Sequence, residues 1–296
     1  MVRGSKKPRF GILDVIVLAV AIAGIAYVTY RVDSVLVYTW DWSAIPGYLF
    51  RYDEELGHWV PNLLIKGLIT TIRISIWALI VASIMGTVLG VMRTSQRLLP
   101  RLIGWAYVEF IRNIPPVPFL FLFYFFISSQ IIPLLNIGSA LDQASPTTLG
   151  IVEFLFGPAN LIENFLSGLI SLSMMSAAYI AEIVRAGILA VPKGQYEAGS
   201  SIGLSKLAIM RYIVLPQAIQ RVVPPIAGQF ITLIKDSSLV ALISIQELSF
   251  LAMEIAISEQ RFFEVWLFTG LMYFTICYAC ALAFGRLEKR MGRHLR

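Results

Sequence analysis

Six apolar segments, each close to the ~20 residues that cross a bilayer as a helix, constrain this chain more than any other feature of its sequence. They lie at about 11–30, 62–92, 103–129, 165–190, 222–244 and 263–285. Of the 296 residues, 57% are hydrophobic. A membrane β-barrel would instead show alternating segments of about ten residues. The sequence therefore predicts an all-α, multi-pass membrane protein with six spans and no room for a large soluble domain.

Basic residues divide the connecting segments into two classes. Eighteen lysines and arginines lie in segments 1–10, 93–112, 182–221 and 285–296. Three lie in the alternate segments, 31–59, 129–165 and 244–262. Because cytoplasmic loops are rich in lysine and arginine, we expect both termini to be cytoplasmic. The net charge of +6 then has a topological cause and does not indicate a nucleic-acid partner.

The first span resembles a signal peptide in its basic start and apolar continuation. Its apolar run extends to Tyr30 without an obvious small-residue cleavage site, so we expect a retained anchor. The segment that follows it is acidic and contains Trp40, Trp42 and Trp59, a composition that predicts an interfacial cap outside the membrane.

Little in the sequence indicates catalysis or a metal site. Cys277 and Cys280 lie in the last apolar segment, but His58 and His294 are distant from them, so we expect two small helix residues and no metal. No nucleophile is grouped with a base, which argues against a membrane enzyme. No GxxxxGK[ST] loop is present, so we expect this chain neither to bind nor to hydrolyse ATP by itself.

A polar stretch, KGQYEAGSSIGLSKLAIMRYIVLPQ, separates the fourth and fifth spans. Pro192 should end the fourth span because proline lacks an N–H and its ring clashes with the preceding turn. We expect a short helix at 193–201, a turn at Gly203, a second helix at 204–212 and an interruption at Pro216.

This polar stretch has two kinds of side chain. Those expected to pack underneath are Leu204, Leu207, Ala208, Ile209 and Ile213, and those expected to face outward are Glu197, Ser200, Ser201 and Lys206. Such an arrangement predicts either a docking helix for a partner protein or an ordinary amphipathic loop on the membrane surface.

The same stretch resembles the EAA loop of ABC importer permeases, the short helix that sits in a groove of the cytoplasmic ATPase. The residues that carry the resemblance are Glu197, Ala198, Gly199, Gly203, Ile213, Leu215 and Pro216. The flanking sequences, AAYIAEIVRAGILAVPKGQYEAG and GQFITLIKDSSLVALI, are similar to the polar amino acid permeases of the histidine, glutamine and arginine uptake type. Gly199 stands where the motif usually has a second alanine, and glycine lowers helix propensity by up to ~1 kcal/mol.

The resemblance covers about residues 62–290 and implies a type I ABC importer permease bundle with five core transmembrane helices. Residues 1–60 would add a cytoplasmic tail, an extra helix and an external loop, and 137–160 would be an insertion. The permease domain would be 61–296, with its coupling loop at 193–216.

The resemblance also implies partners and a location. The chain would lie in the bacterial cytoplasmic (inner) membrane and pair with a second permease subunit, alike or paralogous. Two cytoplasmic ATPases would hold ATP and magnesium, and an external binding protein would deliver a polar amino acid. This chain would bind no cofactor of its own.

Charges within the spans are expensive in lipid, at ~2.5–3.5 kcal/mol each on insertion scales, so each requires a partner or a wet cavity. Lys235 and Asp236 divide the fifth apolar run; we favour a place on the transport path or its gate, with a solvated outer hairpin as the alternative. Arg73 lies about eleven residues into the second span and is expected to line a cavity or to pair with a carboxylate of a partner.

Two pairs of opposite charge stand at i, i+3 near cytoplasmic helix ends, where they share a helix face. They are Glu182 with Arg185 and Glu109 with Arg112. We expect intrahelical ion pairs that either snorkel to the membrane surface or relay movement of the coupling loop.

The family resemblance implies a substrate path near the fourth and fifth spans. Ser173 and Met175 are candidates for it, although Met175 stands where many relatives have asparagine and packing explains it equally well. Gly86 and Gly90 in GTVLG predict close approach of two helices.

An ion-coupled secondary transporter is the alternative function. It requires two comparable halves and buried acids. The sequence has no convincing repeat, and this alternative leaves the polar stretch unexplained.

Overall fold

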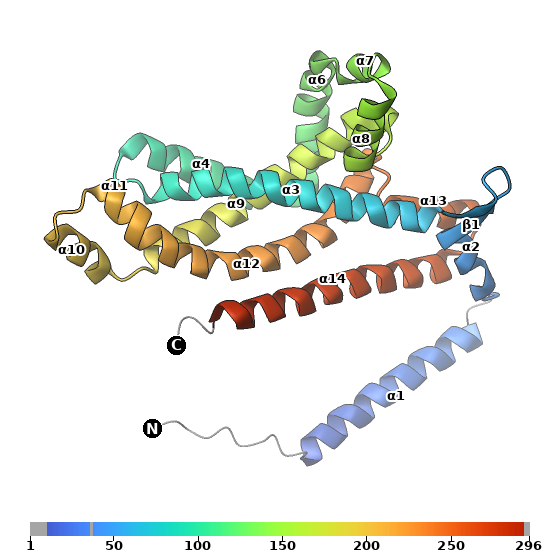
Figure 1. Cartoon of the computed structure of the whole chain (residues 1–296). Coiled ribbons are helices and arrows are strands. Elements are labelled where there is room, and N and C mark those ends of the chain that lie inside the picture. The colour runs from blue at the N-terminus through green and yellow to red at the C-terminus, as the bar shows by residue number, and fades with distance from the viewer. Residues whose placement is uncertain (1–10, 36–37, 293–296) are drawn as a thin grey trace. The chain divides into compact units, whose positions relative to one another are not determined.

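The structure, a computed structural model, describes residues 11–35 and 38–292 (Figure 1). The predicted basic tail at 1–10 and His294 lie outside the described residues. The chain divides into two units, residues 1–42 and 43–296. The first unit contains α1 (Ile12–Val35), a largely apolar helix without a distinct polar face, as expected of a helix surrounded by lipid.

Six helical segments in the described part of the chain are long and apolar enough to cross a membrane, which confirms the predicted number. They are Ile12–Arg31, Leu63–Thr94, Pro116–Asp142, Ala159–Leu189, Lys206–Ile243 and Phe262–Arg286. The third and fifth differ from the sequence-based expectation, and in both cases the reason lies at a proline.

The third span does not cover the predicted residues 103–129. The apolar run is divided into α4 (Leu98–Asn113) and α5 (Pro116–Leu122), with an extended break at Ile114 and Pro115. Proline cannot donate to the helix ladder and forces the preceding residue out of helical conformation, so α4 ends there. The span runs instead through α5, η2 (Phe123–Ser128), α6 (Ser129–Ile131), η3 (Pro133–Leu135) and α7 (Ile137–Asp142).

The fifth span begins earlier than predicted because Pro216 does not interrupt it. α11 (Lys206–Ile209) continues through η5 (Met210–Val214) into α12 (Leu215–Asp236). η5 is a π-helical turn, and such a widened turn accommodates the missing N–H and the ring of a proline that follows it. The second helix of the polar stretch and the fifth span are therefore one continuous helix.

The α-helical part of this span ends at Asp236. The backbone continues as a 3₁₀ segment, η6 (Ser237–Ile243), and turns at Ser244, where φ is +63°. The chain then forms α13 (Leu248–Ser258) and α14 (Phe262–Gly292).

A β-hairpin occupies the segment expected to form an interfacial cap. Its strands are β1 (Phe50–Asp53) and β2 (His58–Pro61), which pair antiparallel from Phe50 with Pro61 to Asp53 with His58. Two short helices, η1 (Trp42–Ala44) and α2 (Ile45–Leu49), precede it. We call this end of the second unit the hairpin end.

The central packing contact of the second unit joins α3 (Leu63–Thr94) to α9 (Ile162–Leu189). Small residues recur every fourth position along the buried face of α3, namely Ala78, Ala82, Gly86 and Gly90. A Cβ added to Gly86 would lie 2.9 Å from the Ala177 carbonyl oxygen of α9, and one added to Gly90 would lie 2.7 Å from that of Ala181. The predicted close approach at GTVLG is confirmed.

The predicted insertion forms α7, α8 (Pro146–Phe156) and η4 (Ala159–Leu161). Trp77 of α3 holds α8 in place: its Nε1 donates a hydrogen bond to the Leu155 carbonyl at 3.0 Å, and its ring stacks on Phe156. The predicted insertion is therefore packed against α3.

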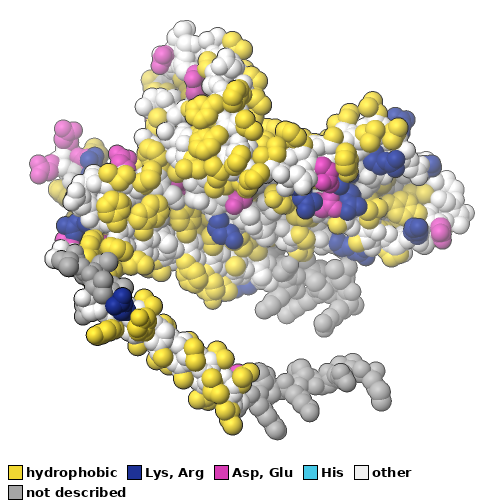
Figure 2. Space-filling model, turned by 180° about the vertical axis from the view of Figure 1, so that it is seen from behind, with side chains coloured by type: hydrophobic (Ala, Val, Ile, Leu, Met, Phe, Trp, Pro, Cys, Tyr) yellow, Lys and Arg dark blue, Asp and Glu magenta, His cyan; other side chains and the backbone are white. Residues whose placement is uncertain are grey.

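Side-chain types are unevenly distributed over the second unit. Figure 2 shows hydrophobic side chains along its length, lysine and arginine gathered toward the end that carries α10 (Lys193–Ser201) and α11, and acidic groups at the hairpin end. We call the end that carries α10 and α11 the loop end. Segments 93–112 and 182–221, which the charge pattern assigned to one side, meet there: Arg93 contacts Glu182, and Lys206 Nζ lies 3.3 Å from Gln96 Oε1.

Candidate functional site

The polar stretch folds as two helices joined by a tight turn. Pro192 immediately precedes α10, and the turn follows at Gly203, where φ is +78°, a conformation that favours glycine. The Gly203 amide donates to the Ser200 carbonyl and the Leu204 amide to that of Gly199, which closes the end of α10. The predicted helix, turn and start of a second helix are confirmed.

Gly199 has a packing role that its helix propensity does not reveal. The residue is buried, and a Cβ there would lie 2.8 Å from Ile213 Cδ1 and 2.9 Å from Ile209 Cγ1. Glycine therefore allows α10 to lie directly on the two isoleucines.

The outer surface of the loop combines polar and apolar groups. Glu197, Ala198 and Lys206 are exposed, as is Leu207, at 78%. The expectation that Leu207 packs underneath is therefore wrong: Ile209 takes that position because it lies half a turn farther round the helix. Ile202 is also exposed, at 74%. Exposed apolar side chains gathered on one helical loop are typical of a contact surface for another protein.

An ion network lies beside this loop. The predicted pair of Glu182 with Arg185 is confirmed, with the Arg185 Nε 2.9 Å from Glu182 Oε1. Arg93 of α3 adds a partner that the sequence did not predict, its Nη1 2.5 Å from Glu182 Oε2. Arg221 of α12 donates from Nη1 to the Ala190 carbonyl at the end of α9. Charged groups thus connect α3, α9 and α12 where the loop begins.

The second predicted pair, Glu109 with Arg112, is not formed among the described residues. Glu109 accepts from Asn113 Nδ2 at 3.1 Å, and the Arg112 guanidinium lies over the Tyr179 ring, 5.6 Å from its centroid. Asn113, the last residue of α4, therefore takes the place of Arg112 as the hydrogen-bond donor to Glu109. Arg112 makes a cation–π contact with Tyr179 of α9 instead of an ion pair.

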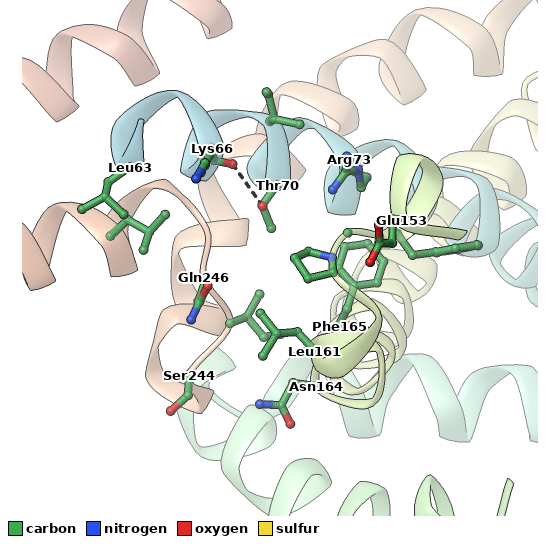
Figure 3. Close-up of a pocket in the computed structure, with 16 residues that line it drawn as sticks. Leu63, Lys66, Thr70, Arg73, Glu153, Leu161, Asn164, Phe165, Ser244 and Gln246 are labelled. Atoms are coloured by element: carbon green, nitrogen blue, oxygen red, sulfur yellow. Dashed lines mark hydrogen bonds between the residues drawn. The ribbon is translucent and has the colours of Figure 1, made fainter. Parts of the chain in front are cut away.

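A cavity of about 480 Å³ opens between α3, α8, the start of α9 and the turn before α13. We call it the α3–α8 cavity. Arg73 lines it, as one of the sequence alternatives predicted, together with Lys66 and Thr70 of the same helix and Glu153 of α8 (Figure 3). Gln246 and Asn164 lie on other sides of the cavity. Its walls are otherwise largely apolar.

Lys235 and Asp236 lie elsewhere. Lys235 is exposed and lines a smaller cavity of about 310 Å³ with four hydroxyl groups, those of Ser238, Ser249, Thr269 and Tyr273. The Thr269 hydroxyl is buried and has no hydrogen-bond partner among the described residues. Asp236 is half-buried and does not pair with Lys235 in this part of the chain.

Ser173 and Met175 do not reach either cavity. The Ser173 hydroxyl donates to the Leu169 carbonyl within α9 at 2.6 Å. Met175 is buried between α4, α5 and α9 with Val108, Phe119 and Phe123. The structure thus gives Met175 the packing role that the sequence had left as the alternative.

The buried carboxylate of Glu247 at the hairpin end was not predicted from the sequence. Glu247 accepts hydrogen bonds from the Tyr273 hydroxyl at 2.5 Å, the Thr71 hydroxyl at 3.2 Å and the Phe250 amide at 2.9 Å. Burial raises the pKa of Glu247 above its ordinary range, and these donors oppose the rise. The residue caps α13 and joins it to α3 and α14. A lone glutamate before an apolar run was the only sequence signal.

Within residues 11–35 and 38–292, no three side chains of histidine, cysteine, aspartate or glutamate lie close enough together to hold a metal ion. Cys277 and Cys280 are free and half-buried in α14. The two surfaces with features of a site are therefore the polar loop and the cavities.

Residues 84–293 match the family of binding-protein-dependent transport system inner membrane components. A probable glutamine ABC transporter permease of Bacillus subtilis is 33% identical over 78% of this chain and 94% of its own length. A glutamate/aspartate import permease of Escherichia coli is 31% identical over 86% of this chain and 99% of its own length. The ion-coupled alternative finds no support among these relatives.

Solved structures share the fold. A chain from a crystal structure of an amino acid ABC transporter with histidines has a TM-score of 0.65 and 28% identity, and it covers 86% of this chain and 100% of its own. A chain of an inward-facing methionine ABC transporter is similar in fold alone, with a TM-score of 0.54 at 17% identity over 77% of this chain and 96% of its own.

Proposed function

The chain belongs to the family of binding-protein-dependent transport system inner membrane components, and we propose that it carries a polar amino acid into the cell as one permease subunit of an ATP-driven importer. The relatives named for glutamine and for glutamate and aspartate support this substrate class. The family description supports a location in the inner membrane.

One observation supports a partner ATPase at the loop end. The coupling loop, residues 193–216, combines the exposed Glu197 and Ala198 with the exposed apolar side chains of Ile202 and Leu207. Leaving such side chains in water is unfavourable, and a hydrophobic groove in a partner protein would bury them. ATP and magnesium would be bound by two such partners, and this chain would supply the docking helix.

The loop is well connected for passing on a movement of its partner. α10 follows α9 after three residues, and α11 continues into α12 without a break. A displacement of the loop would therefore act on two spans at once. With a second permease subunit across the path, rigid-body rotation of the two bundles would expose the substrate to one side and then to the other. An external binding protein would deliver the substrate.

Arg73, Lys235 and Asp236 are the residues that we propose for the path or its gate. Each is a charged group within a span, and both Arg73 and Lys235 border a cavity. In this arrangement the loop end and both termini face the cytoplasm. Residues 61–296 form the permease domain, and residues 1–60 add a further helix.

Charge reversal at Glu197 tests the docking. Glu197→Lys should leave the chain inserted but should abolish ATP-driven uptake in vesicles reconstituted with the partner ATPase and binding protein, because it changes the docking surface alone. Glu54→Lys, a charge reversal at another exposed glutamate, at the hairpin end, is the matched control and should retain uptake. Normal uptake by Glu197→Lys would refute the assignment, as would accumulation of amino acid against a gradient without nucleotide.

A further inference from the structure

The α3–α8 cavity has the size and the mixed polarity of a small-molecule site. Its volume of about 480 Å³ falls within the roughly 300–1,000 Å³ that is usual for ligand pockets. Apolar walls with a few convergent polar groups are also usual for such pockets. What distinguishes this cavity is its set of charges.

Two cations lie on one stripe of α3. Lys66, Thr70 and Arg73 stand at i, i+4 and i+7, so their side chains share the helix face that borders the cavity (Figure 3). Lys66 is in the first turn, and Arg73 lies about 10 Å farther along the axis at 1.5 Å per residue. Neither cation forms an ion pair with any residue in the described ranges. The stripe therefore extends positive charge from the end of α3 toward its middle.

The inserted segment supplies the opposite wall and the one carboxylate. A Cβ added to Gly157, where α8 ends with φ at +100°, would lie 3.0 Å from Arg73 Nη1, so glycine leaves room for the guanidinium. Glu153 lies four residues earlier on α8 and lines the same cavity. Trp77 fixes α8 to α3 through its bond to the Leu155 carbonyl. Arg73 and Glu153 are thus held in neighbouring positions without an ion pair between them.

The charges select among amino acids, and this step rests on the proposed function. A ligand with two carboxylates and one ammonium group would match two cations and one carboxylate. A neutral amino acid would leave one cation uncompensated, and a basic one would add a like charge, which is costly for a group placed inside a span. We propose that the α3–α8 cavity binds an acidic amino acid, with its carboxylates on Lys66 and Arg73 and its ammonium on Glu153.

Direct binding tests this proposal without the binding protein, whose own selectivity would otherwise decide the result. The complex of this chain with its ATPase partner, held in lipid nanodiscs, should bind radiolabelled L-glutamate saturably, and unlabelled L-aspartate should compete better than L-glutamine or L-arginine. Arg73→Gln should weaken L-glutamate binding by about tenfold or more, the loss expected for a charge-assisted hydrogen bond. Arg101→Gln, at an exposed arginine of the loop end, should not.

The role of Glu153 has its own test. Glutarate has both carboxylates of glutamate but no ammonium group, so the wild-type complex should prefer glutamate. Glu153→Gln should remove this preference without weakening glutarate binding, because the substitution takes away a negative charge that repels the dianion. A preference that survives the substitution would overturn the assignment of the ammonium site.

A chemical probe covers the case in which Arg73→Gln fails to fold. In a Cys277→Ser, Cys280→Ser background, Thr70→Cys places the one thiol in the cavity. An anionic methanethiosulfonate should modify it faster than a cationic one of similar size, and L-glutamate should protect it. Faster reaction with the cationic reagent, or protection by L-arginine instead of L-glutamate, would overturn the proposal.

Failure of the two proposals can be told apart. ATP-driven uptake of a neutral or basic amino acid that is insensitive to Arg73→Gln would overturn the acidic cavity and leave the importer function intact. Absence of ATP-driven uptake for every amino acid, with saturable L-glutamate binding retained, would overturn the importer function and leave the acidic amino acid site intact.

Discussion

Glu182 of α9 joins α3 through Arg93, and its replacement by glutamine tests the ion network there. The substitution keeps the shape of the side chain and removes its charge. Arg93 and Arg185 both donate to this carboxylate, the former across the α3–α9 contact. The two arginines therefore lose their shared counter-charge in one step.

The expected cost follows from how far each group is exposed. The Arg93 side chain is 10% exposed and that of Glu182 30%. Breaking a fully buried ion pair costs about 3–5 kcal/mol, so partial access of water to Glu182 reduces the expected loss to about 2 kcal/mol. Arg185 is 33% exposed, and its i, i+3 pair should add only about 0.3–0.5 kcal/mol. Each kcal/mol lowers the melting temperature of a chain of this size by about 2 °C or more, so we expect a decrease of at least about 4 °C.

Thermal unfolding of the purified chain in detergent measures this decrease. Arg93→Gln should cost nearly as much as Glu182→Gln, and the double variant should cost little more, with a coupling energy of about 1 kcal/mol or more. Arg185→Gln is the control and should cost less than about 1 kcal/mol. Additive single effects of Arg93→Gln and Glu182→Gln, or a larger effect of Arg185→Gln, would refute the reasoning.

Three further substitutions test other contacts. Gly90→Ala should reduce stability by about 1–3 kcal/mol in thermal unfolding because its Cβ would lie 2.7 Å from the Ala181 carbonyl oxygen, and an unchanged melting temperature would contradict the packing. The raised pKa of Glu247 favours the protonated acid in the folded state, so its stabilising effect is complete below the ordinary pKa of 4.5 and is lost as the pH rises through the raised value. The melting temperature should fall over that range, and Glu247→Gln should flatten this part of the curve; identical slopes would exclude the effect. Trp77→Phe removes the hydrogen bond to the Leu155 carbonyl and should speed proteolysis within 137–160, with about 1 kcal/mol lost locally; unchanged cleavage would show that the insertion is held by other contacts.

Local signals in the sequence were sufficient for much of the fold. Apolar length predicted six spans, and the small residues of GTVLG predicted the contact between α3 and α9. Pro192 and Gly203 predicted the start and the turn of the coupling loop, because each acts on the backbone within a few residues of itself. Such features depend little on the rest of the chain.

Proline was the source of both errors in the spans. Pro115 and Pro116 ended a helix that the apolar pattern continued, whereas Pro216 was passed by a helix that its presence should have interrupted. The difference lies in the preceding turn, which is extended at Ile114 and π-helical at 210–214. Composition alone does not reveal which of these the chain adopts.

The candidate sites depended more on contacts between distant segments. Arg93 and Glu182 are 89 positions apart, so no spacing rule connects them. The i, i+3 rule instead predicted an ion pair of Glu109 with Arg112 that Asn113 and Tyr179 displaced. Arg73 was expected at a cavity or beside a partner's carboxylate because a charge in a span requires one of these. Glu153 lies in the predicted insertion, whose position only the fold reveals.

The seam of small residues between α3 and α9 limits how this molecule can move. At Gly86 and Gly90 the two backbones are so close that even one added methyl group would collide with α9. Such tight packing favours movement of α3 and α9 as one rigid body, with the ion network of Arg93 near one end of α3 and the stripe of Lys66 and Arg73 toward the other. We therefore expect a tilt imposed at the loop end to move the wall of the α3–α8 cavity at the other end of the same pair of helices.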